Sequence, residues 1–233
     1  MSGPAALTNS PVVTVNALLD VTGLNNGPTL ERRSGQTLMG NGNINGSVNI
    51  AAGATLAPGL SIGVLTVTNN VNLNGTTVME VQSAPNTNDR LHCITGTITY
   101  GGTLVVTNLT PITGTNTYQL FQGALAGSFA NVVLPSLPGV TWNTANLNVN
   151  GTITAFQSVA TTPINLAFSL AGNGLDISWP GDHIGWRLEG QTNSVNVGIS
   201  NNWVTVVGSA ATNRVIVPFN PANGTVFYRL VYP

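Results

Sequence analysis

The sequence predicts an all-β protein: an irregular right-handed β-solenoid followed by a small antiparallel β-sandwich. In residues 40–67, short β-type runs alternate with Asn-Gly, Ala-Gly and Pro-Gly corners and carry no charged residue. Asn and Gly tolerate the left-handed backbone of tight corners, while Val, Ile and Thr suit a pleated sheet. Similar phrases return along the chain, and near Ala160 the pattern changes to that of conventional alternating strands.

Repetition of one phrase favours a solenoid. Residues 71–78 and 147–154 both read apolar-Asn-apolar-Asn-Gly-Thr and continue with β-branched residues or Thr, and residues 44–48 are a partial copy. Irregular self-similarity of this kind is typical of stacked coils that vary in length. The further expected strands are Val12–Val15, Leu18–Val21, Thr29–Leu30, Leu91–Tyr100, Thr103–Leu109, Tyr118–Phe121 and Phe129–Leu134.

The C-terminal part reads as a separate sandwich. Leu175, Ile177 and Trp179 alternate with polar residues, and turns at Asn173-Gly174 and Asn223-Gly224 separate strands of similar spacing. This pattern indicates a small antiparallel fibronectin- or immunoglobulin-like sandwich. We therefore expect a solenoid domain over 1–160 and a sandwich over 161–233.

Composition limits the classes of function that this chain can have. Only 6% of the 233 residues are charged, Lys is absent and the net charge is −1. Such a chain does not attract nucleic acid or anionic membranes, so we expect neither partner. Its uncharged, hydrogen-bonding surface is that of an extracellular wall or matrix protein. The single cysteine, Cys93, closes no intrachain disulfide, so it does not indicate a redox compartment.

The N-terminus has neither a basic start nor a continuous apolar core, so it does not match a secretory signal. No apolar run approaches the roughly 18 residues that a membrane-spanning helix needs. We therefore expect a secreted or cell-surface protein of which this chain is a fragment or processed form.

Residues 53–67, Gly-Ala-Thr-Leu-Ala-Pro-Gly-Leu-Ser-Ile-Gly-Val-Leu-Thr-Val, carry a family resemblance. Together with later phrases at 74–76, 89–91, 100–106 and 121–129, they resemble the autotransporter-associated β-strand repeat proteins over residues 35–157. Leu60 and Val64 depart from the usual pattern. The resemblance implies a passenger-like surface β-solenoid. The tail, 179–230, resembles a β-sandwich module of secreted proteins of the Verrucomicrobia.

Three motifs resemble catalytic or metal-binding patterns, and for each we favour an interpretation without chemistry. Gly59–Gly63 matches the G-x-S-x-G nucleophile pattern around Ser61, with Asp89 and His92 following in hydrolase order, but a strand pattern follows where the mechanism needs a helix. In His92-Cys93, neighbouring side chains of a strand point to opposite faces, which separates imidazole from thiol. Asp182-His183 lacks further ligands at metal-site spacing, so we expect a solvated turn there. We expect no catalytic residue, no metal and no cofactor.

Aromatic residues supply the candidate ligand-binding positions. Trp186 and Trp203, with Trp142 and Trp179, could form a platform for sugar stacking, although a small sandwich needs large side chains to fill its core. The Asn-x-Thr/Ser sites at Asn45, Asn74, Asn108, Asn150 and Asn223 match a glycosylation pattern, which the turn role of Asn also explains. The Thr alternation of 95–99 resembles ice-binding faces and is equally ordinary for a strand.

The sequence therefore predicts a non-catalytic structural or adhesive segment of a secreted or surface-displayed bacterial β-repeat protein, with an extracellular glycan or matrix as its partner. The alternative is a carbohydrate-binding sandwich carried on a solenoid stalk. A polysaccharide-processing solenoid enzyme ranks third, because no cluster of carboxylates marks a cleft.

Overall fold

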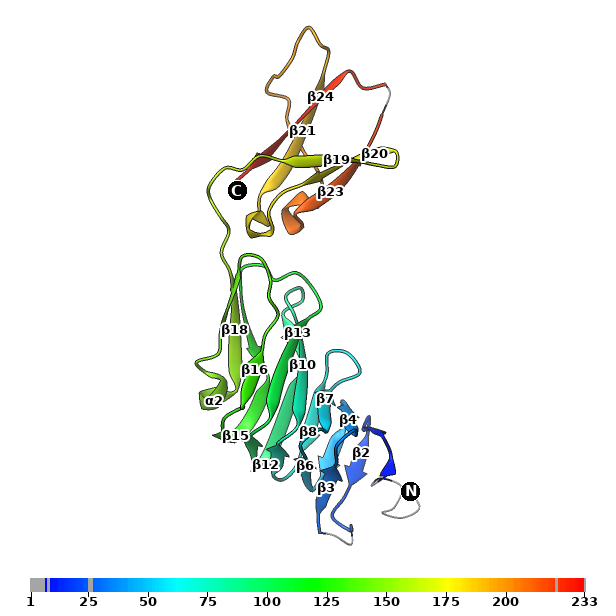
Figure 1. Ribbon diagram of the computed structural model, residues 1–233, viewed down its shortest axis with the longest axis vertical. Helices are drawn as coiled ribbons and strands as arrows, with labels where there is room; N and C mark the ends of the chain where they lie inside the picture. Colours follow the sequence, from blue (N-terminus) through cyan, green and yellow to red (C-terminus); the bar gives the residue numbers. More distant parts are fainter. Residues whose placement is uncertain (1–6, 8, 25–26, 221, 233) are drawn as a thin grey trace. The chain divides into compact units, whose positions relative to one another are not determined.

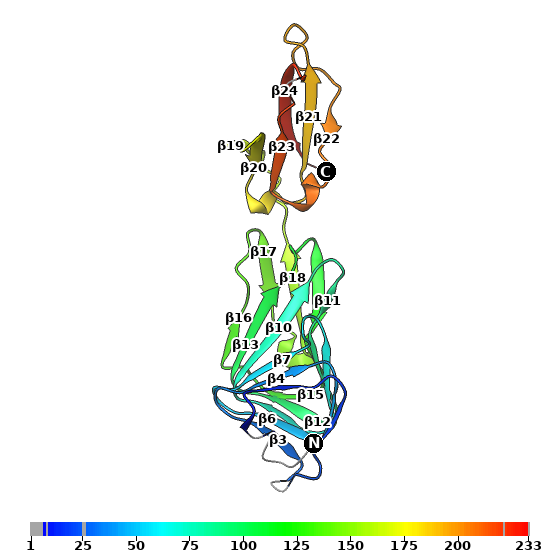
Figure 2. The ribbon, with the colours of Figure 1, turned by 90° about the vertical axis from the view of Figure 1, so that its right-hand side faces the viewer.

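The computed structural model describes residues 7, 9–24, 27–220 and 222–232, and Figures 1 and 2 show it from two sides. The chain forms two compact units, Met1–Ser136 with Trp142–Phe156 and Leu137–Thr141 with Gln157–Pro233. The first is a parallel β-solenoid of about five turns and the second consists of small antiparallel sheets. The predicted fold class is confirmed.

Parallel strands from successive coils form the first wall of the solenoid, because each coil returns to the same position beside the last. In spatial order this sheet contains β1 (Val12–Thr14), β4 (Thr37–Gly40), β7 (Thr55–Pro58), β10 (Thr76–Gln82), β13 (Thr103–Asn108) and β16 (Asn131–Val133). β11 (Thr87–Asn88) folds back antiparallel to β10.

A second sheet closes the solenoid with two parallel rows that merge on one long strand. One row contains β2 (Leu18–Asp20), β5 (Asn43–Asn45) and β8 (Val64–Val67); the other contains β3 (Thr29–Arg32), β6 (Ser47–Ile50) and β9 (Val71–Leu73). Both rows pair with β12 (Arg90–Tyr100), which also pairs with β15 (Phe121–Gly127).

Inward side chains stack from coil to coil because the strands are in register. Leu65 lies beside Leu91, and Leu91 beside Phe121, all fully buried. Polar and aromatic groups end such stacks. Arg32 occupies the register position of Ile50 and donates hydrogen bonds to the carbonyl oxygens of Leu7 and Ser10. At the other end of the same stack Tyr100 lies in register with Leu73, and its ring stacks on that of Phe129 at 4.5 Å between ring centroids.

The Asn-Gly-Thr phrase of 147–154 does not form another solenoid rung like that of 71–78. Leu147–Asn150 is the short helix α2, which Gly151 ends in a left-handed conformation with φ of 77°. β18 (Thr152–Gln157) then pairs antiparallel with β14 (Thr115–Gln119), and β17 (Val140–Asn143) completes that sheet. Two segments of similar sequence thus adopt different structures: residues 71–78 form parts of β9 and β10, and residues 147–154 form α2 and the start of β18.

The second unit is a sandwich of two antiparallel sheets. One contains β19 (Ala167–Ala171), β20 (Gly174–Ser178) and β23 (Arg214–Pro218); the other contains β22 (Val204–Thr205), β21 (Arg187–Asn193) and β24 (Thr225–Val231). Two short 3₁₀ segments, η1 (Gly181–His183) and η2 (Ser209–Ala211), join strands. Ile177 and Trp179 pack with Leu188 in the core between the sheets.

Candidate functional site

Polar side chains gather at the Gly59–Gly63 segment, which joins β7 to β8. The carboxylate of Asp89, only 2% exposed, accepts hydrogen bonds from the backbone N–H of Gly63 at 2.9 Å and of Glu80 at 2.8 Å. A hollow of about 100 Å³ at this point is lined by Ser61, Glu80 and Asp89 among others. Asp89 thus fastens the segment to the next coil.

The structure brings Ser61 and Asp89 to one hollow without building a hydrolase site. β8 begins at Val64, directly after the segment, so a strand stands where the nucleophile mechanism needs a helix. Within the described residues the Ser61 hydroxyl forms no hydrogen bond, and none links Asp89 to His92. Sequence reasoning flagged Asp89 as a candidate acid but missed its tie to Gly63, which joins residues far apart in sequence.

We expect the Asp89 carboxyl to make stability depend on pH. Burial raises its pKa to about 7, although two N–H donors favour the charged form. Between its ordinary value near 4 and about 7 the folded protein therefore holds a proton that the unfolded chain releases. The free energy of unfolding should fall as pH rises through this window, by up to about 1.4 kcal/mol per pH unit.

Urea denaturation at pH 5 and pH 8 measures this effect. Wild type should be more stable at pH 5, and Asp89→Asn, which cannot ionise, should show a much smaller difference. An equal difference in both proteins would show that Asp89 is not the group responsible.

His92 and Cys93 lie on opposite faces of β12. Cys93 is buried in the stack with Val67, and its thiol contacts the carbonyl oxygen of Asn69 at 3.0 Å. His92 is half-buried and lies in register with outward-facing Thr66. Burial raises the pKa of the Cys93 thiol, which disfavours the thiolate.

Two rows of uncharged side chains lie on the outer surface of the first sheet. Thr37, Thr55, Thr76 and Thr103 occupy one register position in successive strands and are all half-buried. Coils in such a sheet repeat at about 4.8 Å, so the hydroxyls form a regular row. The neighbouring outward row contains Met39, Ala57, Val78 and Val105. The sequence offered a signal for the first row, a Thr that opens each of these strands.

The second sheet also carries polar outward rows. Asn49 lies beside Asn72, and its amide donates a hydrogen bond to the carboxylate of Glu31 at 2.6 Å. In the 95–99 stretch the Thr95 hydroxyl donates to the carbonyl oxygen of Thr68. No charged residue stands between Arg90 and Asp176 in the sequence, so the later coils contribute only neutral groups.

Asparagines of the glycosylation-like pattern occur at or next to the ends of elements. Asn45 ends β5, Asn74 follows β9, Asn108 ends β13, Asn150 ends α2 and Asn223 precedes β24. The Asn150 side chain accepts hydrogen bonds from the backbone N–H and hydroxyl of Thr152. Such bonds are typical of Asn in turns.

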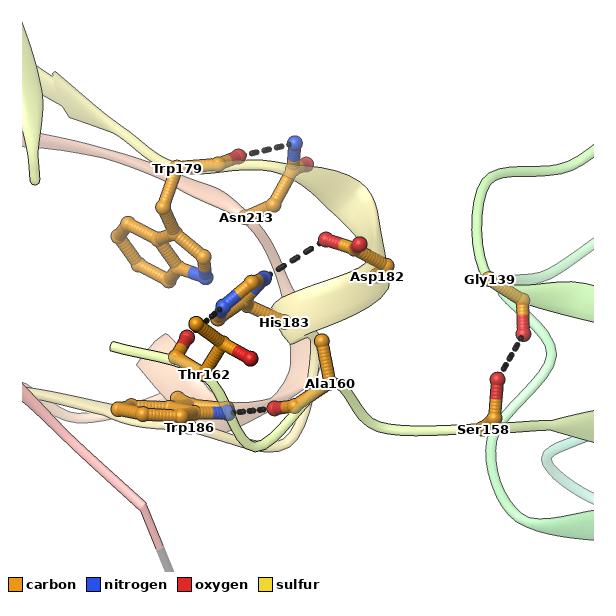
Figure 3. A network of polar contacts seen from close by, with 9 residues as sticks. All are labelled: Gly139, Ser158, Ala160, Thr162, Trp179, Asp182, His183, Trp186 and Asn213. Carbon is orange, nitrogen blue, oxygen red and sulfur yellow. Dashed lines mark hydrogen bonds and ion pairs between the residues drawn. The ribbon is translucent and has the colours of Figure 1, made fainter. Parts of the chain in front are cut away.

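In the second unit His183 fastens the segment that leads into the sandwich (Figure 3). The expected solvated turn at Asp182-His183 is wrong for His183, because its ring is buried on η1. Its Nδ1 lies 2.7 Å from Asp182 Oδ1 and its Nε2 lies 2.8 Å from the carbonyl oxygen of Thr162. A carbonyl oxygen can only accept, as can an ionised carboxylate, so the arrangement favours protons on both ring nitrogens. Burial alone would lower the pKa of His183, but these two contacts outweigh it and raise the pKa.

This geometry predicts that Asp182→Asn lowers the pKa of His183, because the substitution removes the negative charge and leaves the Thr162 contact in place. Nuclear magnetic resonance of the imidazole protons measures this pKa, with His92→Gln as the background that assigns the signal. The wild-type pKa should lie above the ordinary value near 6.5. An unchanged pKa in Asp182→Asn would contradict the proposed role of the carboxylate.

The four tryptophans are held by neighbouring groups. Trp186 is 5% exposed; its indole N–H donates to the carbonyl oxygen of Ala160 at 2.8 Å, and its ring contacts those of His183 and Tyr232. Trp203 is half-buried, and the guanidinium of Arg229 lies 4.2 Å from its ring centroid.

The remaining two tryptophans also contact neighbouring groups of the protein. Trp179 belongs to the sandwich core, and its carbonyl oxygen accepts a hydrogen bond from the Asn213 side chain (Figure 3). Trp142 donates to the carbonyl oxygen of Pro135. In the described residues the rings thus make internal contacts, and sugar stacking on Trp186 or Trp203 stays a prediction.

Across the described part of the chain, no three His, Cys, Asp or Glu side chains converge as metal ligands would. No helix there has the length and apolar character to cross a bilayer. Neither the models of known protein families nor the sequences of curated proteins match the chain.

Proposed function

We propose that this chain is a non-catalytic structural or adhesive segment of a secreted or surface-displayed bacterial protein of the autotransporter-repeat type. The observation that carries the proposal is a solenoid whose outward rows are almost wholly uncharged. The row of Thr37, Thr55, Thr76 and Thr103 repeats one hydroxyl per coil over an in-register apolar stack.

The physical basis is backbone pairing. Each coil satisfies its N–H and C=O groups on the neighbouring coils, so the body needs few charges for stability and offers hydroxyl and amide groups over a long surface. Contact with an extracellular glycan or matrix protein would then use hydrogen bonds rather than ion pairs. Such contacts depend little on salt, whereas contacts between exposed charges are screened.

Adhesion of the full chain to an array of glycans and matrix proteins tests this proposal, at about 0.05 M and about 0.5 M NaCl, between which charge screening rises strongly. We expect ligands that are retained at the higher salt concentration and weakened by Thr55→Glu combined with Thr76→Glu. The matched control is Thr115→Glu, which changes an exposed threonine outside the row.

Two results would contradict the proposal. One is retention that disappears at high salt. The other is labelling by a fluorophosphonate probe that is lost in Ser61→Ala, which would identify a hydrolase instead.

A further inference from the structure

The sandwich has an apolar face that no described strand covers. Phe168 and Leu170 of β19 lie opposite Ile177 and Leu175 of β20 in the antiparallel pair. Opposite residues share a face of the sheet, and Ile177 is in the core, so Phe168 and Leu170 face inward. They are nevertheless 74% and 79% exposed.

β24 has a free edge on the same side of the sandwich. Among the described strands it pairs with β21 alone, so the backbone groups on its other side have no strand partner. In Figure 2, β24 is the edge strand of its sheet on the side of β19. A free edge of this kind is a template for one more strand.

Two neighbouring hollows are lined in part by residues of β24. One of about 290 Å³ is lined by Leu166, Phe168, Leu175, Ile177 and Tyr228. A second of about 400 Å³ shares Leu175 and Tyr228 with the first and extends to Val226 and Phe219. No charged side chain lines either hollow, so an occupant must be neutral where it faces inward.

The open position lies beside the free edge of β24. Ile177 of β20 packs in one cluster with Leu188 of β21 and Tyr228 of β24, so β20 already lies opposite those strands. β19 therefore faces the position next to β24, which immunoglobulin-type sandwiches fill with a strand. The β24 edge of a second copy fits this space less well, because its own second sheet would enter the layer that β19 and β20 occupy.

We propose that the β24 edge accepts one extended segment of another polypeptide, which pairs with β24 and covers Phe168 and Leu170 with alternating apolar side chains. The free backbone edge selects a peptide over a lipid or a sugar, since only a strand continues the ladder. The uncharged lining selects neutral side chains at the inward positions. This inference is independent of the function proposed for the solenoid.

A displayed library of random peptides of about nine residues, the length of a long strand, tests the inference when it is selected on the immobilised full chain. We expect enrichment of uncharged peptides with apolar residues at alternate positions. Fluorescence anisotropy of the most enriched peptide then compares the variants. Leu170→Asp should weaken binding by about tenfold or more, because it buries a charge against the added strand.

The matched control is Val204→Asp, which places the same charge on the other edge strand, β22, at a side chain that is 69% exposed. It should leave binding unchanged. Absence of enrichment, enrichment without alternation, or equal affinity for wild type and Leu170→Asp would overturn the proposal. A dimer of the full chain that Leu170→Asp dissociates would overturn it in favour of a second copy as the occupant.

Discussion

Replacing Leu91 by Ala is expected to lower the free energy of unfolding of the solenoid by about 2–5 kcal/mol. Leu91 is fully buried between Leu65 of one coil and Phe121 of the next. The fixed backbone of both neighbours limits collapse around the vacated volume, so the lost burial and the remaining cavity both add to the cost. Urea denaturation followed by circular dichroism measures the change.

His92→Ala is the matched control, because it removes an outward side chain from the same strand. Its effect should stay within about 0.5 kcal/mol, as for most surface substitutions. Similar losses in the two variants would contradict the inward stack as the source of stability.

Gly102→Ala is expected to destabilise the solenoid by about 1–3 kcal/mol or more, as overpacking does. A Cβ at position 102 would lie 1.9 Å from the carbonyl oxygen of Gly75 on the neighbouring coil. That oxygen also accepts the hydrogen bond from the N–H of Thr103 at 2.9 Å. The coils must therefore separate where they are paired, and a flexible side chain cannot relieve the contact.

Gly23→Ala adds the same methyl group at a position with open space around it. Thermal unfolding of both variants gives the comparison. We expect the midpoint of Gly102→Ala to fall by several degrees and that of Gly23→Ala to stay close to wild type. Equal midpoints would contradict close coil-to-coil contact at Gly102.

Local sequence predicted many strands of the solenoid, but it did not mark β4 or β7, and the single strand expected at Tyr118–Phe121 is divided between β14 and β15. The alternation in Ser47–Ile50 and Val64–Val67 places every second side chain inside, and these runs form β6 and β8. The pairing of strands was harder to predict from the sequence, because it joins residues that are a whole coil apart. The Asn-Gly-Thr phrase shows what local sequence does not determine. Gly151 ends a helix in a left-handed conformation, whereas Gly75 connects β9 of one sheet to β10 of the other.

The candidate sites could be predicted from the sequence only in part. Asp182-His183 was visible as a pair, but its third partner is the backbone carbonyl of Thr162, and any residue type can supply that group. Asp89 likewise binds two backbone N–H groups. The free edge of β24 depends on the arrangement of whole sheets, so no local pattern marks it.

Hydrogen exchange of the full chain tests the central claim most directly, namely that backbone pairing between coils holds the solenoid together. Amides of β7, β10 and β13, which have a parallel neighbour on each side, should exchange most slowly, and those of the outermost strands β1 and β16 should exchange faster. Exchange in β10 as fast as in β1 and β16 would contradict the account.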